Sequence, residues 1–330
     1  MLAVLAIGAA PVGAAPSVLP ARDTGLGFYY VEDMQKDRGR EAAELQDMAA
    51  RGCNTLTVYF RNPGEIARQL DGALEAGLLD RRFPVCLLNN SPLKTGEAAR
   101  QARLLGKRVA EWPTLCNYGP DEIPAGRRVG LETWIREENV PHLPVVVASD
   151  AAAVTEYADL LDMALVIDHG CTPEVQAALR AQGHSFAAYT IATHVQGTEL
   201  YVRYLVGLWA WKTRPRVLLA WCYHDTLADA PGDRRLRAWQ EGALDYRILL
   251  GLEQAITAHP ERPEAAAARA WLDNLRRRIV TPTSEWVGRP PTYADVYAVN
   301  QQPPPLVNFG MIRQWAGYYL AALTGTENAW

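Results

Sequence analysis

Residues 143–190 read LPVVVASDAAAVTEYADLLDMALVIDHGCTPEVQAALRAQGHSFAAYT, and this stretch decides the fold class. Its three apolar runs are separated by two stretches of helical periodicity: Leu143–Ser149, Ala151–Leu161, Ala164–Asp168, Pro173–Gln182 and Phe186–Thr190. The runs are apolar at successive positions instead of alternate ones, which is typical of parallel strands that are covered on both faces. The stretch therefore predicts repeated βα units around a parallel sheet.

The same alternation continues on both sides of this stretch. Upstream, strands and helices are predicted at Leu26–Val31, Glu41–Arg51, Thr55–Phe60, Glu65–Ala76, Pro84–Asn90, Glu97–Glu111, Leu115–Tyr118 and Gly126–Glu138. Downstream, they are predicted at Thr198–Lys212, Val217–Tyr223 and Asp233–Ile256. Eight strands, each followed by a helix, predict an α/β protein with a single (β/α)8 barrel, the TIM barrel. A doubly wound open sheet is the alternative, but the Gly-rich phosphate turn it normally carries is missing.

The barrel is expected to span residues 25–256, with a segment on either side. Residues 257–330 contain helical patterns at Ala265–Arg278 and Met311–Ala322 and are expected to form a helical extension packed on the barrel. Residues 1–24 begin with an apolar run and small residues, as a secretory signal does, but lack its basic start. They are either such a signal, which favours a secreted or periplasmic protein over a cytoplasmic one, or a lead-in to the first strand.

Composition excludes several classes of function. The 33 basic and 37 acidic residues give a net charge of -4 and are interspersed, so we expect no nucleic-acid partner. No stretch after the start reaches the roughly 18 apolar residues of a membrane span, so we expect no membrane insertion. The 5 cysteines show neither CxxC pairs nor zinc-ligand spacing. We therefore expect buried free thiols, no metal site and no cofactor.

Polar and aromatic residues follow the predicted strands, at the end where barrel enzymes build their sites. Together with 10 Trp and 14 Tyr against 5 Phe, they suit a carbohydrate, whose ring faces stack on aromatics and whose hydroxyls form hydrogen bonds. The expected substrate is thus a glycan or glycoconjugate, and the oligomeric state is left open. The residues expected to bind it are Tyr29, Tyr59, Asn89, Asn117, Tyr118, Asp168, His169, Tyr189, Trp221, Tyr223, His224 and Asp225.

Asp121 and Glu122 form the candidate catalytic pair. They follow the fourth strand in a turn bounded by Gly119, Pro120 and Pro124, so both side chains can face the barrel mouth. Two neighbouring carboxylates disfavour double ionisation, which raises the pKa of one and suits it to general acid work. Glycosidic cleavage needs such an acid, usually with a second charged group. The pair therefore predicts a glycoside hydrolase.

Two segments resemble glycoside hydrolase family 123 and its uncharacterised bacterial relatives. WPTLCNYGPDEIP (residues 112–124) resembles that family's Tyr-x-x-Asp-Glu-Pro segment, with Ile123 intervening before Pro124. LRAWQEGALDYRILLGLEQAI (residues 236–256) resembles the helix after its last strand, with Gln240 in place of an Arg. GLWAWKTRPRVLLAWCYHD (residues 207–225) is similar to its seventh helix and eighth strand. The resemblance covers about residues 25–256.

The resemblance implies a retaining, exo-acting β-N-acetylhexosaminidase, of the N-acetylgalactosaminidase type. Glu122 would be the general acid and base, and Asp121 would orient the substrate's 2-acetamido group as the nucleophile, with Tyr189 a candidate to bond its carbonyl. The β-sandwich that usually precedes the barrel in that family is missing here, which puts the substrate in doubt. On the second motif, Glu241, Asp245 and Arg247 are expected to be structural ion-pair partners.

Two alternatives stay open at this point. The first is a glycosidase for sugars without an acetamido group, with Glu122 as the acid and Asp168 or Asp225 as the second carboxylate. The second is a barrel that binds carbohydrate without catalysis. It explains the aromatic residues equally well but gives no role to the Asp-Glu pair.

Overall fold

The computed structural model describes residues 19–30, 38–59, 63–88, 112–137, 143–193, 198–224, 230–282 and 307–326. The predicted helix Glu97–Glu111 and the candidate residues Asn89 and Asp225 lie outside these ranges. Within them, no helix is both long enough and apolar enough to cross a membrane. The described residues include all five cysteines, which are buried and unpaired as expected.

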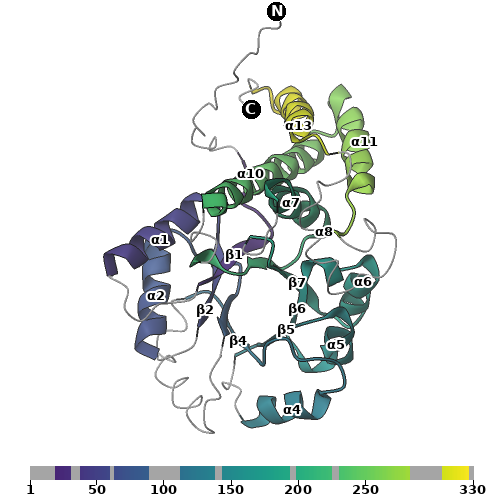
Figure 1. Cartoon of the computed structure of the whole chain (residues 1–330). Helices are drawn as coiled ribbons and strands as arrows, with labels where there is room; N and C mark the ends of the chain where they lie inside the picture. The colour runs from purple at the N-terminus through teal and green to yellow at the C-terminus, as the bar shows by residue number, and fades with distance from the viewer. Residues whose placement is uncertain are drawn as a thin grey trace, which may run out of the picture.

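Eight parallel strands close into a barrel in sequence order, so the predicted (β/α)8 fold is confirmed (Figure 1). The first strand pairs with the last, for example Leu26 with Leu218, which closes the ring. The strands are β1 (Gly25–Tyr30), β2 (Thr55–Tyr59), β3 (Val85–Leu88), β4 (Leu115–Tyr118), β5 (Val145–Ser149), β6 (Met163–Ile167), β7 (Ser185–Thr190) and β8 (Val217–Ala220).

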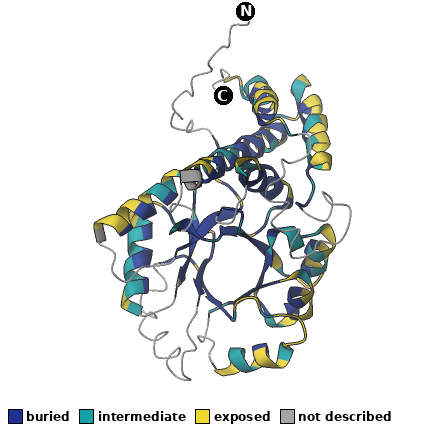
Figure 2. Ribbon diagram, viewed as in Figure 1, coloured by how far each residue is buried: buried dark blue, intermediate teal, exposed yellow. Residues whose placement is uncertain are grey.

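Helices surround this ring, and their outer faces carry the exposed residues while the strands are buried (Figure 2). Those beside the barrel are α1 (Arg38–Ala50), α2 (Pro63–Glu75), α4 (Arg128–Glu137), α5 (Ala151–Glu156), η2 (Ala158–Leu160), η3 (Asp168–Gly170), α6 (Pro173–Ala181), α7 (Glu199–Tyr204), η4 (Leu205–Trp209) and α8 (Ala210–Thr213). The long helix α10 (Ala230–Ala258) follows β8, and α11 (Pro263–Arg278) and α13 (Phe309–Thr324) pack beside it.

Three elements depart from the sequence prediction. The long helix expected over residues 198–212 contains a π-helical turn, η4, between α7 and α8. The helix expected over residues 151–161 ends early, because Tyr157 closes α5 and a 3₁₀ turn follows. The eighth strand ends at Ala220 instead of Tyr223, because Tyr223 and His224 begin a helical turn.

The core has two layers, which follow from the alternation of side chains along each strand. In β4, Cys116 and Tyr118 belong to the cluster inside the barrel, whereas Leu115 belongs to the cluster between the strands and the helices. In β1, Tyr29 belongs to the inner cluster and Tyr30 to the outer one. Each strand therefore directs one set of residues into the barrel and the other set toward a helix.

An ion-pair network fastens the last helix to the barrel. Asp245 of α10 is 1% exposed and accepts hydrogen bonds from Arg203 of α7 (2.6 Å) and Arg313 of α13 (2.5 Å). Arg313 also pairs with Glu241 at 2.6 Å. The predicted structural role of Asp245 and Glu241 is thus confirmed. Arg247 instead donates to the backbone oxygens of Leu19 and Pro20, which ties the start of the described chain to α10.

Candidate functional site

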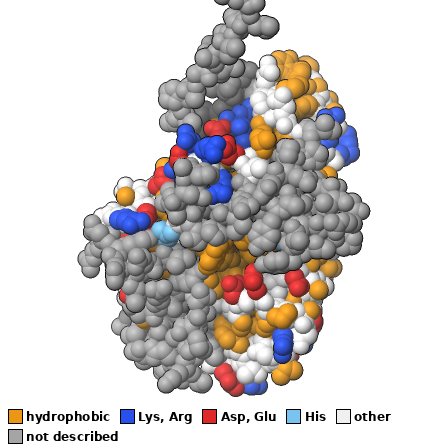
Figure 3. Space-filling view, in the orientation of Figure 1, with side chains coloured by type: hydrophobic (Ala, Val, Ile, Leu, Met, Phe, Trp, Pro, Cys, Tyr) orange, Lys and Arg blue, Asp and Glu red, His pale blue; other side chains and the backbone are white. Residues whose placement is uncertain are grey.

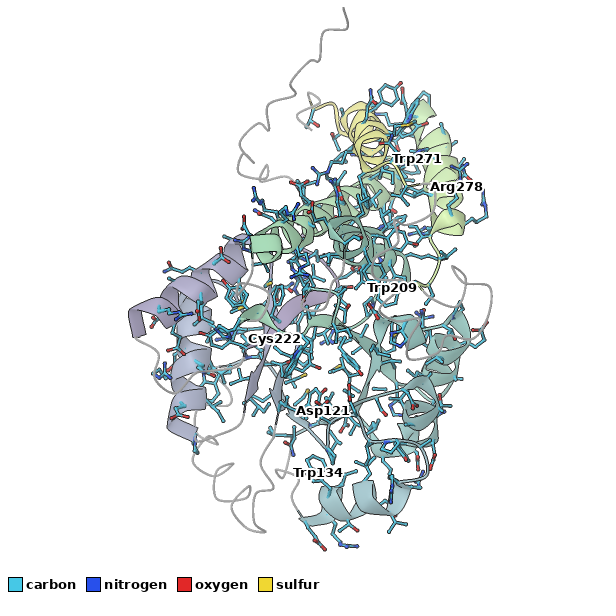
Figure 4. All side chains as sticks on the ribbon, in the orientation of Figure 1. Asp121, Trp134, Trp209, Cys222, Trp271 and Arg278 are labelled. Atoms are coloured by element: carbon cyan, nitrogen blue, oxygen red, sulfur yellow. The ribbon has the colours of Figure 1, made fainter. Side chains whose placement is uncertain are left out.

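The turn after β4 carries Asp121 at the end of the barrel where the strands terminate. Tyr118 is the last residue of β4 and points into the barrel, and its hydroxyl donates to Asp121 Oδ1 at 2.8 Å. The hydroxyls of Tyr118 and Tyr29 lie 3.0 Å apart. Three predicted site residues from two strands are therefore brought together. Figure 4 labels Asp121 beside the ring of strands.

The neighbouring β5–α5 unit holds the turn in place. Ser149 donates to the backbone oxygen of Ile123, and the Tyr157 hydroxyl donates to that of Pro124 at 2.6 Å. The Tyr157 oxygen also accepts from the backbone N–H of Arg127 at 2.7 Å. Gly119 has no Cβ, and one added there would lie 3.1 Å from the ring of Trp134. The turn is thus fixed by backbone contacts on both sides of the carboxylate pair.

Glu122 occupies a left-handed backbone conformation, with φ of 51°. Residues with a Cβ seldom adopt this region, which costs about 1 kcal/mol or more and is found most often at functional turns. Both Glu122 and Asp121 are exposed. The strained turn therefore presents two adjacent carboxylates to solvent.

The protonation properties of the group around Asp121 follow from burial and charge. The surrounding protein removes water from Asp121 and raises the pKa of its carboxyl, although the bonds from Tyr118 and from the backbone of Glu122 act the other way. Because the side chain is exposed by its accessible area, this desolvation is partial. Burial raises the pKa of the Tyr29 and Tyr118 hydroxyls well above their usual value. Both tyrosines therefore stay protonated, and the Tyr118 hydroxyl can donate to Asp121.

Tyr189 lies within electrostatic range of both Asp121 and Asp168. Burial raises the pKa of Tyr189, and the nearby charges of Glu122, Asp121 and Asp168 raise it further. These contributions show that all three carboxylates lie within electrostatic range of one hydroxyl. The described part of this mouth is thus acidic. Figure 3 shows acidic and hydrophobic side chains next to one another near the middle of one face.

Asp168 is 2% exposed, and its oxygens are occupied by protein donors. Thr190 donates to Oδ2 at 2.7 Å and Tyr201 at 2.9 Å. The backbone N–H of His169 donates to Oδ1 at 2.7 Å, and the His169 Nδ1 lies 3.3 Å from the same oxygen. Asp168 is therefore placed to orient His169 instead of reaching a ligand itself. Its partners Thr190 and Tyr201 complete the network.

Tyr223 and His224 lie on the outer side of the barrel, against α1. Tyr223 donates to Asp47 at 2.6 Å, and His224 Nε2 is 2.9 Å from Glu44 Oε2. Glu44 also accepts from Tyr30 at 2.8 Å. Sequence reasoning missed Glu44 and Asp47, because acidic residues on a predicted surface helix give no sign of partners on other elements; in the structure Glu44 is buried and Asp47 is partly exposed. The structure does not bring Tyr223 and His224 together with Asp121, because β8 ends earlier than predicted.

The other candidates have simpler placements. Trp221 is partly buried, and its ring lies 5.3 Å from that of Tyr29 in an edge-to-face arrangement. Asn117 is 4% exposed, on β4. The backbone of Tyr59 ends β2, and its side chain is outside what the structure describes. No group of three or more metal-ligating side chains occurs among the described residues. Ligand binding by any of these residues stays a prediction.

Comparisons with known proteins find similarity at the level of fold. No protein-family model matches the sequence, and no curated protein matches it. A tryptophan synthase from M. tuberculosis is 16% identical, with a TM-score of 0.40 over 68% of this chain and 93% of that one. A putative dihydrodipicolinate synthetase from Pseudomonas aeruginosa is 14% identical, with a TM-score of 0.39 over 91% and 99%.

A mandelate racemase/muconate lactonizing protein from Herpetosiphon aurantiacus is 14% identical over 53% of this chain, with a TM-score of 0.34. This chain spans about half of that protein's length (49%). Of these three proteins, the tryptophan synthase and the putative dihydrodipicolinate synthetase are named as enzymes, and none of the three is named as a glycoside hydrolase. The prediction of a glycoside hydrolase, whether a retaining β-N-acetylhexosaminidase or a glycosidase for sugars without an acetamido group, is contradicted by these findings. The barrel fold is what the comparisons support.

Proposed function

We propose that the chain is an enzyme that transfers a proton to or from a polar small molecule at the barrel mouth, with Asp121 as the residue that carries the proton. One observation carries this proposal: an exposed carboxyl with a raised pKa is bonded to a buried tyrosine pair. A general acid or base works best when its pKa lies near the working pH, and the shift at Asp121 is in that direction.

Three further residues give the proposed site its other functional groups. Glu122 is exposed in the same turn and supplies a further carboxylate. His169 is oriented by Asp168, as a base is oriented by a carboxylate in many acid-base sites. Tyr189 supplies a protonated hydroxyl near all three carboxylates. These groups support a substrate that offers hydroxyls or other hydrogen-bond donors.

The acidic character of the described mouth favours neutral or cationic substrates over anionic ones. Carboxylates accept hydrogen bonds from hydroxyls, and the partly buried Trp221 offers an aromatic surface. The carbohydrate partner expected from the sequence is therefore kept as the first substrate class to test. Polyols and amino alcohols, which are neutral and cationic, form the second and third classes.

The test is a screen in deuterated water with the wild-type protein and Asp121→Asn. Each compound is incubated with protein, and mass spectrometry detects deuterium uptake or a changed product. We expect conversion of at least one class, and a loss of about 10²–10⁴-fold in rate in the variant, the range of general acid-base contributions. Asp273→Asn, an exposed acid on α11, is the matched control and should keep full activity. Equal turnover in wild type and Asp121→Asn would refute the role of Asp121.

A further inference from the structure

A pocket lies outside the barrel, between α11 and α13. It has a volume of about 190 Å³, and its floor includes Leu208 of η4. Figure 4 labels Trp271 where α11 faces α13, and Arg278, the last residue of α11, close to it. The cavity belongs to the helical extension and shares no residue with the site around Asp121.

The wall of this pocket is apolar and carries a single charged side chain among the described residues that line it. The apolar part of the wall consists of Leu208, Trp271, Leu275, Ile279, Val307, Met311, Ile312 and Trp315, and the amides of Asn274 and Asn308 add two neutral polar groups. Arg278 is the charged residue, and it is exposed. It forms no ion pair with any residue in the described part of the chain, unlike Arg276, which pairs with Glu253. An apolar pocket with one guanidinium matches a ligand that has an apolar body and one negative charge.

The size of the pocket limits the ligand to a small group. An apolar cavity of about 150 Å³ holds a benzene ring, whereas drug-sized ligands occupy about 300–1,000 Å³. The pocket, at about 190 Å³, therefore fits one ring. Its aromatic wall is held by ring contacts: Tyr319 lies 6.1 Å from Trp271 and 6.0 Å from Trp315. The two tryptophans thus pack against the same tyrosine ring.

The outer face of α13 adds to the aromatic character of this region. Trp315 and Met311 both line the pocket and are 43% and 53% exposed. Figure 3 shows hydrophobic side chains gathered over α13, with basic ones beside them over α11. An exposed apolar patch with polar or charged residues at its rim commonly marks a binding site.

We propose that this pocket binds a small carboxylate whose body is a single aromatic ring. The ring lies between Trp271, Trp315 and Leu275, and the carboxylate pairs with Arg278. A guanidinium binds a carboxylate through two parallel hydrogen bonds, which a neutral or cationic group cannot replace. This binding site is independent of the reaction proposed at the barrel mouth.

The experiment measures binding of three probes of one shape and different charge: 3-phenylpropanoate, 3-phenylpropan-1-ol and 3-phenylpropylammonium. Isothermal titration and saturation-transfer NMR are applied to the full chain. We expect the carboxylate to bind about tenfold more tightly than the alcohol, and the ammonium ion to bind most weakly. Arg278→Gln should reduce the affinity for the carboxylate about tenfold, to the level of the alcohol.

Arg277→Gln is the matched control, because Arg277 is the exposed neighbour in sequence and does not line the pocket. It should change the affinity less than about twofold. Leu275→Trp, which fills the pocket, should abolish binding of all three probes, and circular dichroism checks that each variant is folded. Equal losses in Arg277→Gln and Arg278→Gln, binding that survives Leu275→Trp, or no binding of the carboxylate to the wild type would each overturn the proposal.

Discussion

Tyr29 and Tyr30 are adjacent in β1 and have opposite environments. Tyr29 points into the barrel, where its hydroxyl meets Tyr118, which donates to the exposed Asp121. Tyr30 points outward, where its hydroxyl donates to Glu44 of α1, a carboxylate that His224 also contacts. Each tyrosine thus belongs to a hydrogen-bonded group that contains one carboxylate and one further aromatic residue. We call them the inner group (Tyr29, Tyr118, Asp121) and the outer group (Tyr30, Glu44, His224).

The two groups differ in where their carboxylates lie. Glu44 is 7% exposed, and Arg40 also donates to it at 3.1 Å, in addition to its contacts with Tyr30 and His224. Asp121 is exposed and receives one bond from a side chain. A fully bonded buried carboxylate joins elements of the fold, whereas an exposed one with a raised pKa can exchange protons with a ligand. Polar aromatic residues on or after a strand can therefore either form structural contacts, as Tyr30 does, or belong to the candidate functional site, as Tyr29 does.

The largest effect is expected when the outer group loses its carboxylate. Glu44→Ala removes the carboxylate shared by the buried Tyr30 and the partly buried His224, so the free energy of unfolding should fall by about 2–4 kcal/mol. Urea denaturation followed by circular dichroism measures this. Gln46→Ala, an exposed position on the same helix, is the control and should change it by less than about 0.5 kcal/mol. If Glu44→Ala lowers the free energy of unfolding as little as Gln46→Ala does, the outer group is not a structural contact and does not differ from the inner group in this way.

A smaller effect is expected from Tyr118→Phe in the inner group. The hydroxyl of Tyr118 favours the ionised form of Asp121, so its removal should raise the pKa of Asp121 further. Loss of the hydrogen bond should also cost about 1 kcal/mol of stability. Carbon-13 NMR titration of the Asp121 carboxyl measures the pKa without any substrate, so the result does not depend on the proposed reaction.

Tyr29→Phe is the matched variant, since it removes a hydroxyl that does not touch Asp121. It should shift the pKa of Asp121 less than Tyr118→Phe does. A pKa of Asp121 that is unchanged in Tyr118→Phe would show that the hydrogen bond does not tune the carboxyl.

The sequence predicted the barrel because strand and helix periods are local properties. The strands were predicted within a few residues; β4, Leu115–Tyr118, matches to the residue. The placement of Tyr118 beside Asp121 also followed from the position of a turn after a strand. The function did not follow, because a motif of two carboxylates is compatible with many reactions.

Contacts between distant segments were beyond reach of sequence reasoning. His224 was expected at the mouth, but its place depends on where β8 ends and on Glu44, which lies 180 residues earlier in the chain. Asp168 read as a residue for a ligand, yet Thr190 and Tyr201 occupy its oxygens. Such partners depend on how distant elements pack against one another, and the periodicity of one segment does not predict that packing.

The smallest effect is expected on stability in Asp121→Asn, and its sign separates the two groups most sharply. The folded state raises the pKa of Asp121 above its ordinary value of 3.8. As the pH rises through the interval between these two values, the unfolded chain loses this proton first, so the wild-type protein loses stability. Asparagine does not titrate and avoids this loss of stability.

Above the interval the variant should therefore be as stable as the wild type or up to about 0.5 kcal/mol more stable, since the side chain is exposed and the effect is screened. Below it, where Asp121 is neutral, this advantage should disappear. Urea denaturation at a pH below 3.8 and at about pH 8 measures both cases. A variant that is destabilised at both, as Glu44→Ala is expected to be, would place Asp121 among the structural contacts.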